Sequence, residues 1–443
     1  MKNRILLVLI FFACYALFAE TLNLEQARTL ALANSRSLAK YNLAIKTSEL
    51  DDRSRIYSNL PSLSMGASAS MTLWSAANAA PVNNPLDTLS SGMNVGVSQR
   101  IFEGGKSIIQ KAINGLTHES ARIDALAEYF NVLDSVDSAY YAVLEAAASL
   151  QAEESSLESA AASLAIAEIR HTAGIINPGD YLKAMAEKES RENSRNQARR
   201  NLVLASSKLN SLTGLRRTFE LEQIDFSSYA VLMERMGTIS VEEEDSIYDK
   251  FWKLLAAANP SLAKSALAKG RAEKNLSMAR TSYSPTLSAS FSTGLNYSPN
   301  NGLETSSGRV SLSLSIPVDF WVQANNVQKS KLSLESSALD YVSAGIQLET
   351  ELQSALFNVF ANAGSFLSSR RSLEYAEKHF EYMSERYRLS QSSVSEYGDA
   401  STLLINSRNS HIKASYGFLQ SLSKLRSLSA IDDEERLTEL LLR

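Results

Sequence analysis

The chain has 443 residues, of which 44% are hydrophobic and 21% charged, and its formal net charge is −4. This balance contains no excess of basic residues, so it argues against a nucleic-acid partner. Its 18 glycines and 8 prolines are few for this length. Because few residues break regular structure, we expect a small number of long elements.

The first residues have the pattern of a secretory signal peptide. Two basic residues precede an apolar run over 5–18, and Ala19 offers a cleavage position. An uncleaved anchor is one alternative, and lipidation of Cys14, the only cysteine, is another. We expect residues 1–19 to be removed. No later stretch reaches 18 consecutive apolar residues, so any membrane-spanning part has to consist of strands.

The rest of the chain contains one order of elements twice. SLAK at 37–40 recurs 224 residues later at 261–264, and PSLS at 61–64 recurs as PTLS at 285–288. In each copy a helical pattern ends at the proline, and a segment of period two follows. We therefore predict a first repeat over 20–214, a connecting segment over 215–248, a second repeat over 249–430 and a tail over 431–443.

Four strands of about ten residues are predicted, over about 61–74, 92–102, 285–297 and 308–318. In each of them apolar residues alternate with Ser, Thr, Gly or Asn, so one face is apolar and the other is small and polar. Ten tilted residues are the length of a transmembrane strand. A soluble sandwich is the alternative, but its water-facing strands usually carry charge. We favour a membrane barrel.

A long helical hairpin follows each pair of strands, over about 105–213 and 325–428. From 105 to 172 there is no proline, and apolar residues recur at steps of three, four or seven, as in a coiled coil. Some 65 helical residues span about 100 Å. Four strands cannot close a barrel, since eight is the practical minimum. The sequence therefore predicts a mainly helical protein that oligomerises through both its strands and its helices.

No group of residues indicates an enzyme. The histidines, His118, His171, His379 and His411, are scattered without the spacing of a zinc site. Neither a phosphate-binding glycine loop nor a nucleophile elbow occurs. We expect no catalysis, no cofactor and no metal.

In the order of these elements the chain resembles the TolC-like outer-membrane efflux proteins, over essentially the whole mature part. The resemblance rests on LEQA at 24–27, PSL at 61–63, VSQRIFEGG at 97–105, which is similar to the family's strand-to-helix junction, and 209–214, which is similar to its Leu-x-x-Leu-x-Gly helix end.

This resemblance implies a homotrimer in the outer membrane with a large periplasmic part. One 12-stranded β-barrel would continue into a 12-helix periplasmic α-barrel. The trimer would be the exit duct of a tripartite efflux or type I secretion system, which takes substrates from an inner-membrane pump and a periplasmic adaptor. A periplasmic coiled-coil scaffold with a soluble strand domain is the alternative reading.

The resemblance also implies residues for the periplasmic end of the pore. The family's second-repeat pattern is Tyr-x-x-Gly-x-Arg-x-x-x-Asp-x-x-Asp. Here Tyr387 matches the tyrosine, Ser390 replaces the glycine and Ser392 replaces the arginine. Glu396 replaces the first aspartate and Asp399 matches the second. Tyr387 and Ser392 are therefore candidate gate residues, although Tyr387 also has the spacing of a helix core position.

In the first repeat, Gly174 and Asp180 match the glycine and the first aspartate, and Asp180 lies 216 residues before Glu396. Asp180, Glu396 and Asp399 would thus form the pore constriction, an electronegative mouth that favours cations. For Asp180 the alternative is an acid that stabilises a helix start. The candidate adaptor-docking turns are Ala173, Gly174 and Ile175, and Leu389, Ser390 and Gln391.

Overall fold

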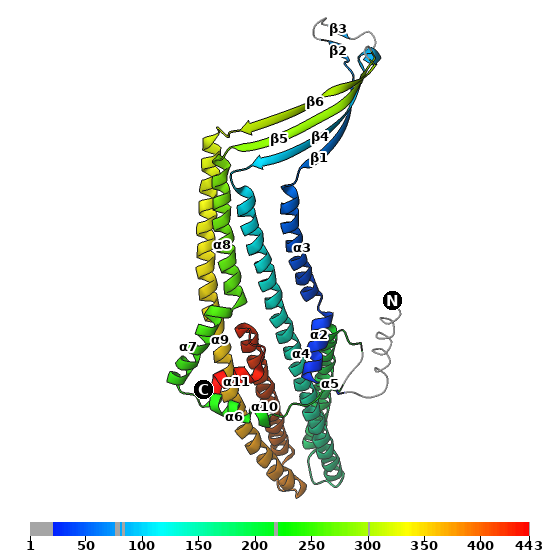
Figure 1. Cartoon of the computed structure of the whole chain (residues 1–443). Helices are drawn as coiled ribbons and strands as arrows, with labels where there is room; N and C mark the ends of the chain where they lie inside the picture. The colour runs from blue at the N-terminus through cyan, green and yellow to red at the C-terminus, as the bar shows by residue number, and fades with distance from the viewer. Residues whose placement is uncertain (1–20, 76–79, 82–84, 217–219, 300–301, 443) are drawn as a thin grey trace, which may run out of the picture. The chain divides into compact units, whose positions relative to one another are not determined.

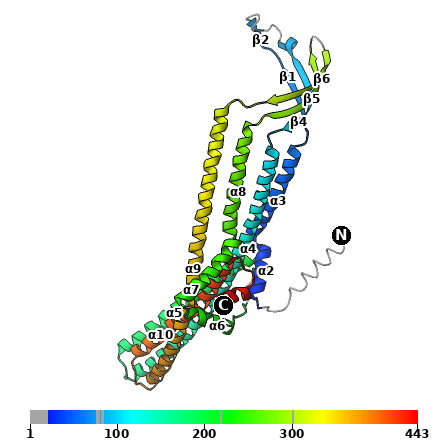
Figure 2. The same cartoon turned by 60° about the vertical axis from the view of Figure 1, so that its left-hand side comes forward.

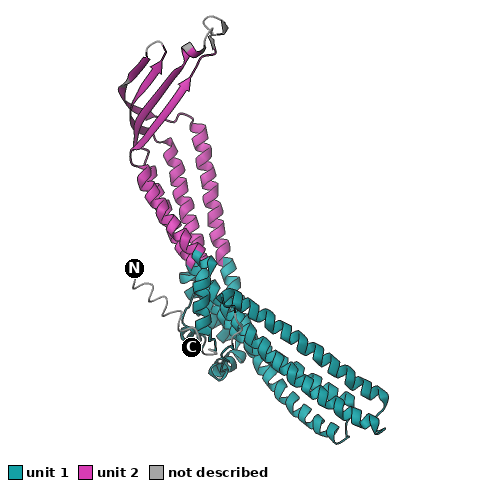
Figure 3. Ribbon diagram, turned by 90° about the vertical axis from the view of Figure 1, so that its right-hand side faces the viewer, with its two compact units in different colours: residues 1–39, 126–260, 346–443 teal, residues 40–125, 261–345 magenta. Residues whose placement is uncertain are grey.

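The structure is a computed structural model that describes residues 21–75, 80–81, 85–216, 220–299 and 302–442. The expected signal peptide over 1–19, with Cys14 and Ala19, lies outside these residues. The chain forms two compact units (Figure 3). The described residues within 1–39, 126–260 and 346–443 form the helical unit, and those within 40–125 and 261–345 form the strand unit.

The strand unit holds a four-stranded antiparallel sheet (Figure 2), whose strands follow the order β1-β4-β5-β6 (Figure 1). Its strands are β1 (Ser62–Ser70), β4 (Ser90–Phe102), β5 (Thr286–Ser298) and β6 (Gly302–Ser315). The β1–β4 pair comes from the first repeat and the β5–β6 pair from the second, and β4 joins them by pairing with β5. A short separate ladder joins β2 (Trp74–Ser75) to β3 (Ala80–Pro81).

Two of the expected strand boundaries differ from the structure. The first strand ends at Ser70 rather than at 74, because the chain leaves the sheet before it forms the β2–β3 ladder. The last strand covers 302–315 rather than 308–318. It stops early because Pro317 has no N–H to donate to a neighbouring strand. Its polar first residues show no apolar alternation, so period two does not reveal them.

Four helices adjoin this sheet along the chain (Figure 1). They are α3 (Arg36–Ser58), α4 (Lys106–Thr172), α8 (Pro260–Arg280) and α9 (Phe320–Arg388), and a 3₁₀ turn over Thr281–Tyr283 leads into β5. Helix α9 begins five residues before the expected position, because the Asp319 carbonyl accepts the Val322 N–H at 2.9 Å. Helices α3 and α8 begin 224 residues apart, as the repeat predicts.

The helical unit contains the far parts of α4 and α9 and six further helices. These are α2 (Leu24–Asn34), α5 (Pro178–Thr213), α6 (Ser227–Gly237), α7 (Val241–Ala258), α10 (Val394–Ser429) and α11 (Glu434–Leu442). The connecting segment and the tail are therefore helical in part. Their apolar residues Met233, Phe251 and Leu437 are each buried, and α11 contacts both α6 and α7.

Length and composition do not make any of these helices a membrane span. Over the described residues, none combines 18 residues or more with sufficient hydropathy to cross a bilayer.

Candidate functional site

One face of the sheet is apolar across all four strands. The register places Leu63 opposite Val97, Val97 opposite Phe291, and Phe291 opposite Val310. These four side chains form a continuous row because residues of one register position share a face. All four are exposed in the single chain, and Val310 is 80% exposed. A continuous exposed apolar row marks a surface that contacts lipid or protein.

The opposite face carries small hydroxyl side chains. The positions next to the apolar row form a serine row. Ser62 lies opposite Ser98, Ser98 opposite Ser290, and Ser290 opposite Ser311. The hydroxyls of Ser62 and Ser98 are 2.6 Å apart. Arg309, opposite Ser292, adds a charge to this face. The sheet is open, because β1 and β6 form its two edges and neither pairs with a further described strand.

The turns between the long helices have the same backbone in both repeats. Gly174 and Ser390 adopt left-handed φ angles of 70° and 59°. In both turns the following residue donates its N–H over 2.8 Å to the carbonyl five residues back, the arrangement of a Schellman motif. A left-handed serine costs about 1–2 kcal/mol that glycine avoids. The candidate docking residues in these turns are all exposed: Ala173, Gly174, Ile175, Leu389, Ser390 and Gln391.

The three candidate constriction carboxylates lie just beyond these turns. Asp180 and Glu396 are the third residues of α5 and α10. Asn177 Nδ2 donates to Asp180 Oδ2 at 2.8 Å, and the Ser393 N–H donates to Glu396 Oε2 at 2.8 Å. The latter bond lowers the pKa of Glu396. Both acids therefore stabilise a helix start, and Asp399 lies exposed one turn further along α10.

The region of the two turns, where α4 leads into α5 and α9 into α10, is here called the tip. Tyr387 belongs to a small buried cluster in it. Its side chain is 1% exposed, its hydroxyl donates to the Ser163 carbonyl at 3.2 Å, and its ring stacks on Tyr397 with centroids 4.9 Å apart. Ala167, Ala184 and Val394 complete the cluster. Such burial favours the core role of Tyr387 in this conformation. Ser392, the other candidate gate residue, is half-buried in the turn before α10.

Arg170, which sequence reasoning missed, connects the two hairpins at the tip. It is buried near the end of α4, and its guanidinium lies 4.6 Å from the centroid of the Tyr387 ring. It donates hydrogen bonds to the carbonyls of Tyr387 and Arg388, the latter at 3.4 Å. Those carbonyls belong to the last turn of α9, where helical partners are lacking. A cation there also offsets the negative end of the helix dipole.

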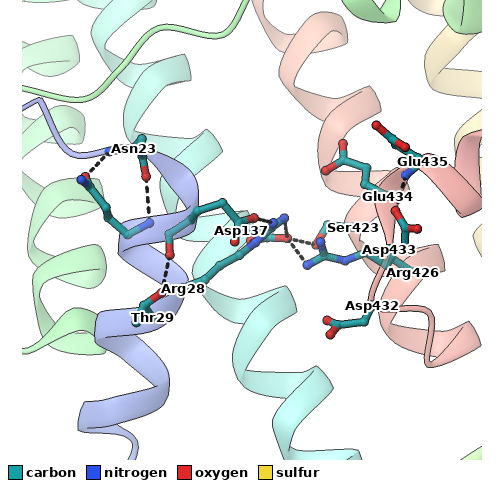
Figure 4. A network of polar contacts seen from close by, with 12 residues as sticks. Asn23, Arg28, Thr29, Asp137, Ser423, Arg426, Asp432, Asp433, Glu434 and Glu435 are labelled. Carbon is teal, nitrogen blue, oxygen red and sulfur yellow. Dashed lines mark hydrogen bonds and ion pairs between the residues drawn. The ribbon is translucent and has the colours of Figure 1, made fainter.

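The helical unit also contains a buried charge network (Figure 4). Asp137 of α4 is fully buried and accepts hydrogen bonds from Arg28 Nε at 2.7 Å, Arg426 Nη2 at 2.6 Å and Ser423 Oγ at 2.9 Å. Burial opposes the charge of Arg28, but the hydrogen bond and charge of Asp137 outweigh it and raise the Arg28 pKa. The network joins α2, α4 and α10. In the sequence, Arg28 lies 109 residues and Arg426 lies 289 residues from Asp137. No local spacing pattern therefore indicates this network.

The described part of the chain places no three His, Cys, Asp or Glu side chains where they could hold a metal ion together.

Comparison with known families identifies both repeats. A family model described as "Outer membrane efflux protein" matches residues 27–215 and 252–430. These two spans correspond to the two copies of helix, strand pair and long helical hairpin.

Individual relatives are distant but cover most of the chain. The protein is 20% identical over 405 residues to outer membrane protein TolC of Escherichia coli (strain K12). This alignment covers 86% of this chain and 76% of TolC. The Campylobacter jejuni CmeC outer membrane channel superposes with a TM-score of 0.74 at 19% identity, over 94% of this chain and 89% of CmeC. VceC of Vibrio cholerae gives 0.71 at 14% identity, over 92% and 96%.

Proposed function

The chain belongs to the outer membrane efflux protein family, and from this membership we propose that it is the exit duct of a tripartite efflux or type I secretion system. It receives substrates from an inner-membrane pump through a periplasmic adaptor and releases them outside the cell. The observation that carries this proposal is the open sheet with one apolar and one serine face. Such a sheet suits a wall between lipid and water.

A homotrimer accounts for the two open edges of the sheet. Three copies contribute twelve strands, and β1 of one copy pairs with β6 of the next. The apolar row with Val310 then faces lipid, and the serine row with Ser311 faces the water-filled interior. The four long helices of each copy, α4, α5, α9 and α10, supply the twelve helices of a periplasmic tunnel. The signal peptide over 1–19 directs the chain to this location.

The tip supplies the inner end of the duct. Asp180, Glu396 and Asp399 form a ring of carboxylates when three copies meet around one axis. Tyr387 and Ser392 lie in the segment that would move on opening, and Arg170 holds that segment in the present conformation. The exposed turn residues at 173–175 and 389–391 dock the adaptor. The shared backbone conformation of the two turns supports an equivalent role for both.

The oligomeric state of membrane-extracted protein tests this function. We expect native mass spectrometry in detergent to give three copies of the mature chain. A periplasmic scaffold would instead leave the cell in the osmotic-shock fraction without detergent. If the protein were recovered as a monomer in the osmotic-shock fraction, the proposal that it is an outer-membrane exit duct would be wrong.

Neutralising the three constriction carboxylates is expected to reduce cation selectivity. A carboxylate about 4 Å from a passing ion contributes about 1 kcal/mol in water, so the ratio of cation to anion permeability should fall about fivefold in Asp180→Asn/Glu396→Gln/Asp399→Asn. Reversal potentials in planar bilayers under a salt gradient measure this ratio. The matched control neutralises three acids near α11, in Asp432→Asn/Asp433→Asn/Glu435→Gln, and should keep the wild-type ratio. An unchanged ratio in the first variant would exclude these residues as the ring.

A further inference from the structure

We propose that the helix ends beside the sheet bind the headgroups of anionic phospholipids. The binding residues are Arg53, Arg280, Lys329 and Lys331, here named the basic helix ends. The location of these residues at a membrane rests on the proposed function. The preference for anionic lipid rests on the charge and exposure of the strand unit itself.

Cations are concentrated at these helix ends. In each of α3, α4, α8 and α9 we take the twelve residues nearest the sheet, and these four stretches together contain ten Lys and Arg but only four Asp and Glu. The whole chain has the opposite balance, with 44 Lys and Arg against 48 Asp and Glu. The excess of positive charge is therefore local to the junction between sheet and helices.

The four basic helix ends keep their charge available. Arg53, Arg280, Lys329 and Lys331 are all exposed. Within the described ranges none of them lies within ion-pairing distance of a carboxylate. A nearby cation shows the contrast, since Arg55 is bound to Asp52 at 2.9 Å and is largely covered. Exposed cations without a protein partner remain free to bind a negatively charged group from outside the chain.

In α3 and at the end of α8, an exposed aromatic residue lies between the cation and the sheet. Tyr57 follows Arg53 by four residues towards β1, and Tyr283 follows Arg280 by three residues towards β5. Spacings of three and four place both members on one side of a helix. Both tyrosines are among the exposed large hydrophobic residues.

Helix α9 runs the other way along the chain but has the same order in space. Phe320 and Val322 are exposed in its first turn, next to β6, and Trp321 between them is 74% exposed. Lys331 follows Phe320 by eleven residues and Lys329 follows Val322 by seven, so each pair shares a helix face. A rise of 1.5 Å per residue puts these lysines about 10–16 Å further from the sheet than their apolar partners.

This order matches the layers of one lipid leaflet. Aromatic rings prefer the boundary between acyl chains and headgroups, and Lys and Arg extend to the phosphate level. A zwitterionic headgroup has no net charge to satisfy these cations, whereas an anionic headgroup gains about fivefold in affinity for each Lys or Arg near it, which corresponds to about 1 kcal/mol. The surface therefore fits an anionic phospholipid.

Quenching of Trp321 fluorescence by brominated lipids tests the proposal. In a Trp74→Phe/Trp252→Phe background, Trp321 is the only tryptophan, and it lies on α9 eight residues before Lys329. The oligomer is reconstituted in phosphatidylcholine vesicles that contain equal fractions of brominated phosphatidylglycerol or brominated phosphatidylcholine. We expect the apparent affinity for the anionic lipid to exceed that for the zwitterionic one by about fivefold.

Substitutions then assign the preference to these residues. Arg53→Gln/Arg280→Gln/Lys329→Gln/Lys331→Gln should bring the two lipids to equal affinity, while brominated phosphatidylcholine still quenches and so reports correct insertion. The control, Lys208→Gln/Lys250→Gln/Lys253→Gln/Lys378→Gln in the helical unit, should keep the preference.

The possible failures are distinguishable. Equal quenching by both lipids before substitution, or an unchanged preference after it, would overturn the lipid proposal alone. No quenching by either lipid would contradict the membrane location, and with it the proposed function.

Discussion

Arginine at Val310 is expected to prevent the protein from assembling in the outer membrane. Val310 ends the continuous apolar row of the sheet and lies near the middle of β6. A lipid-facing arginine at the bilayer midplane costs about 2–4 kcal/mol, and in a trimer this cost arises three times. The measurement is the amount of heat-dissociable trimer in outer-membrane fractions, which should fall below a tenth of the wild-type amount.

Ser311→Arg is the matched control, since it introduces the same side chain one residue away on the serine face. An arginine there faces water in our account, so assembly should stay close to the wild-type level. The lipid-facing assignment of the apolar row would be wrong if Val310→Arg assembled normally, or if Ser311→Arg were the more damaging of the two.

Replacement of Asp137 by asparagine is expected to destabilise the helical unit strongly. The substitution removes the negative charge that Arg28 and Arg426 share, and both arginines are buried. Breaking a buried ion pair by removing one partner costs about 3–5 kcal/mol. The free energy of unfolding, measured by denaturant titration of the detergent-solubilised protein, should fall by about this amount.

Asp134→Asn on the same helix provides the comparison. Asp134 lies 3.6 Å from Lys424, whose side chain is exposed, and such a pair contributes about 1 kcal/mol or less. The triple variant Arg28→Met/Asp137→Leu/Arg426→Met removes every charge of the network and should recover most of the stability, because no buried charge is left unpaired. If Asp137→Asn and Asp134→Asn lost equal stability, the network would not hold the three helices together.

The strands and long helices were predictable because their periodicity is local. Alternation of apolar and serine residues identified the sheet, and prolines such as Pro61 marked where helices end. The polar start of β6 was missed because its residues have no apolar alternation. The pairing of β4 with β5 could not be predicted from the sequence either, since it joins strands from the two repeats.

The candidate tip was predictable only where the repeat places equivalent residues 216 positions apart. In the structure the equivalent residues Gly174 and Ser390 adopt the same left-handed turn conformation. Arg170 was missed, although Arg386 recurs at this offset, because its partners are backbone carbonyls and carbonyls leave no mark on a sequence. The pairing of Arg28 with Asp137 could not be predicted either, since the two residues lie 109 positions apart on α2 and α4.

The conductance of purified wild-type protein in planar lipid bilayers tests the central claim most directly. If several copies form one water-filled duct, the current should rise in discrete, long-lived steps, with one step for each inserted oligomer. Oligomeric protein that is inserted in the bilayer but gives no such steps would contradict the account.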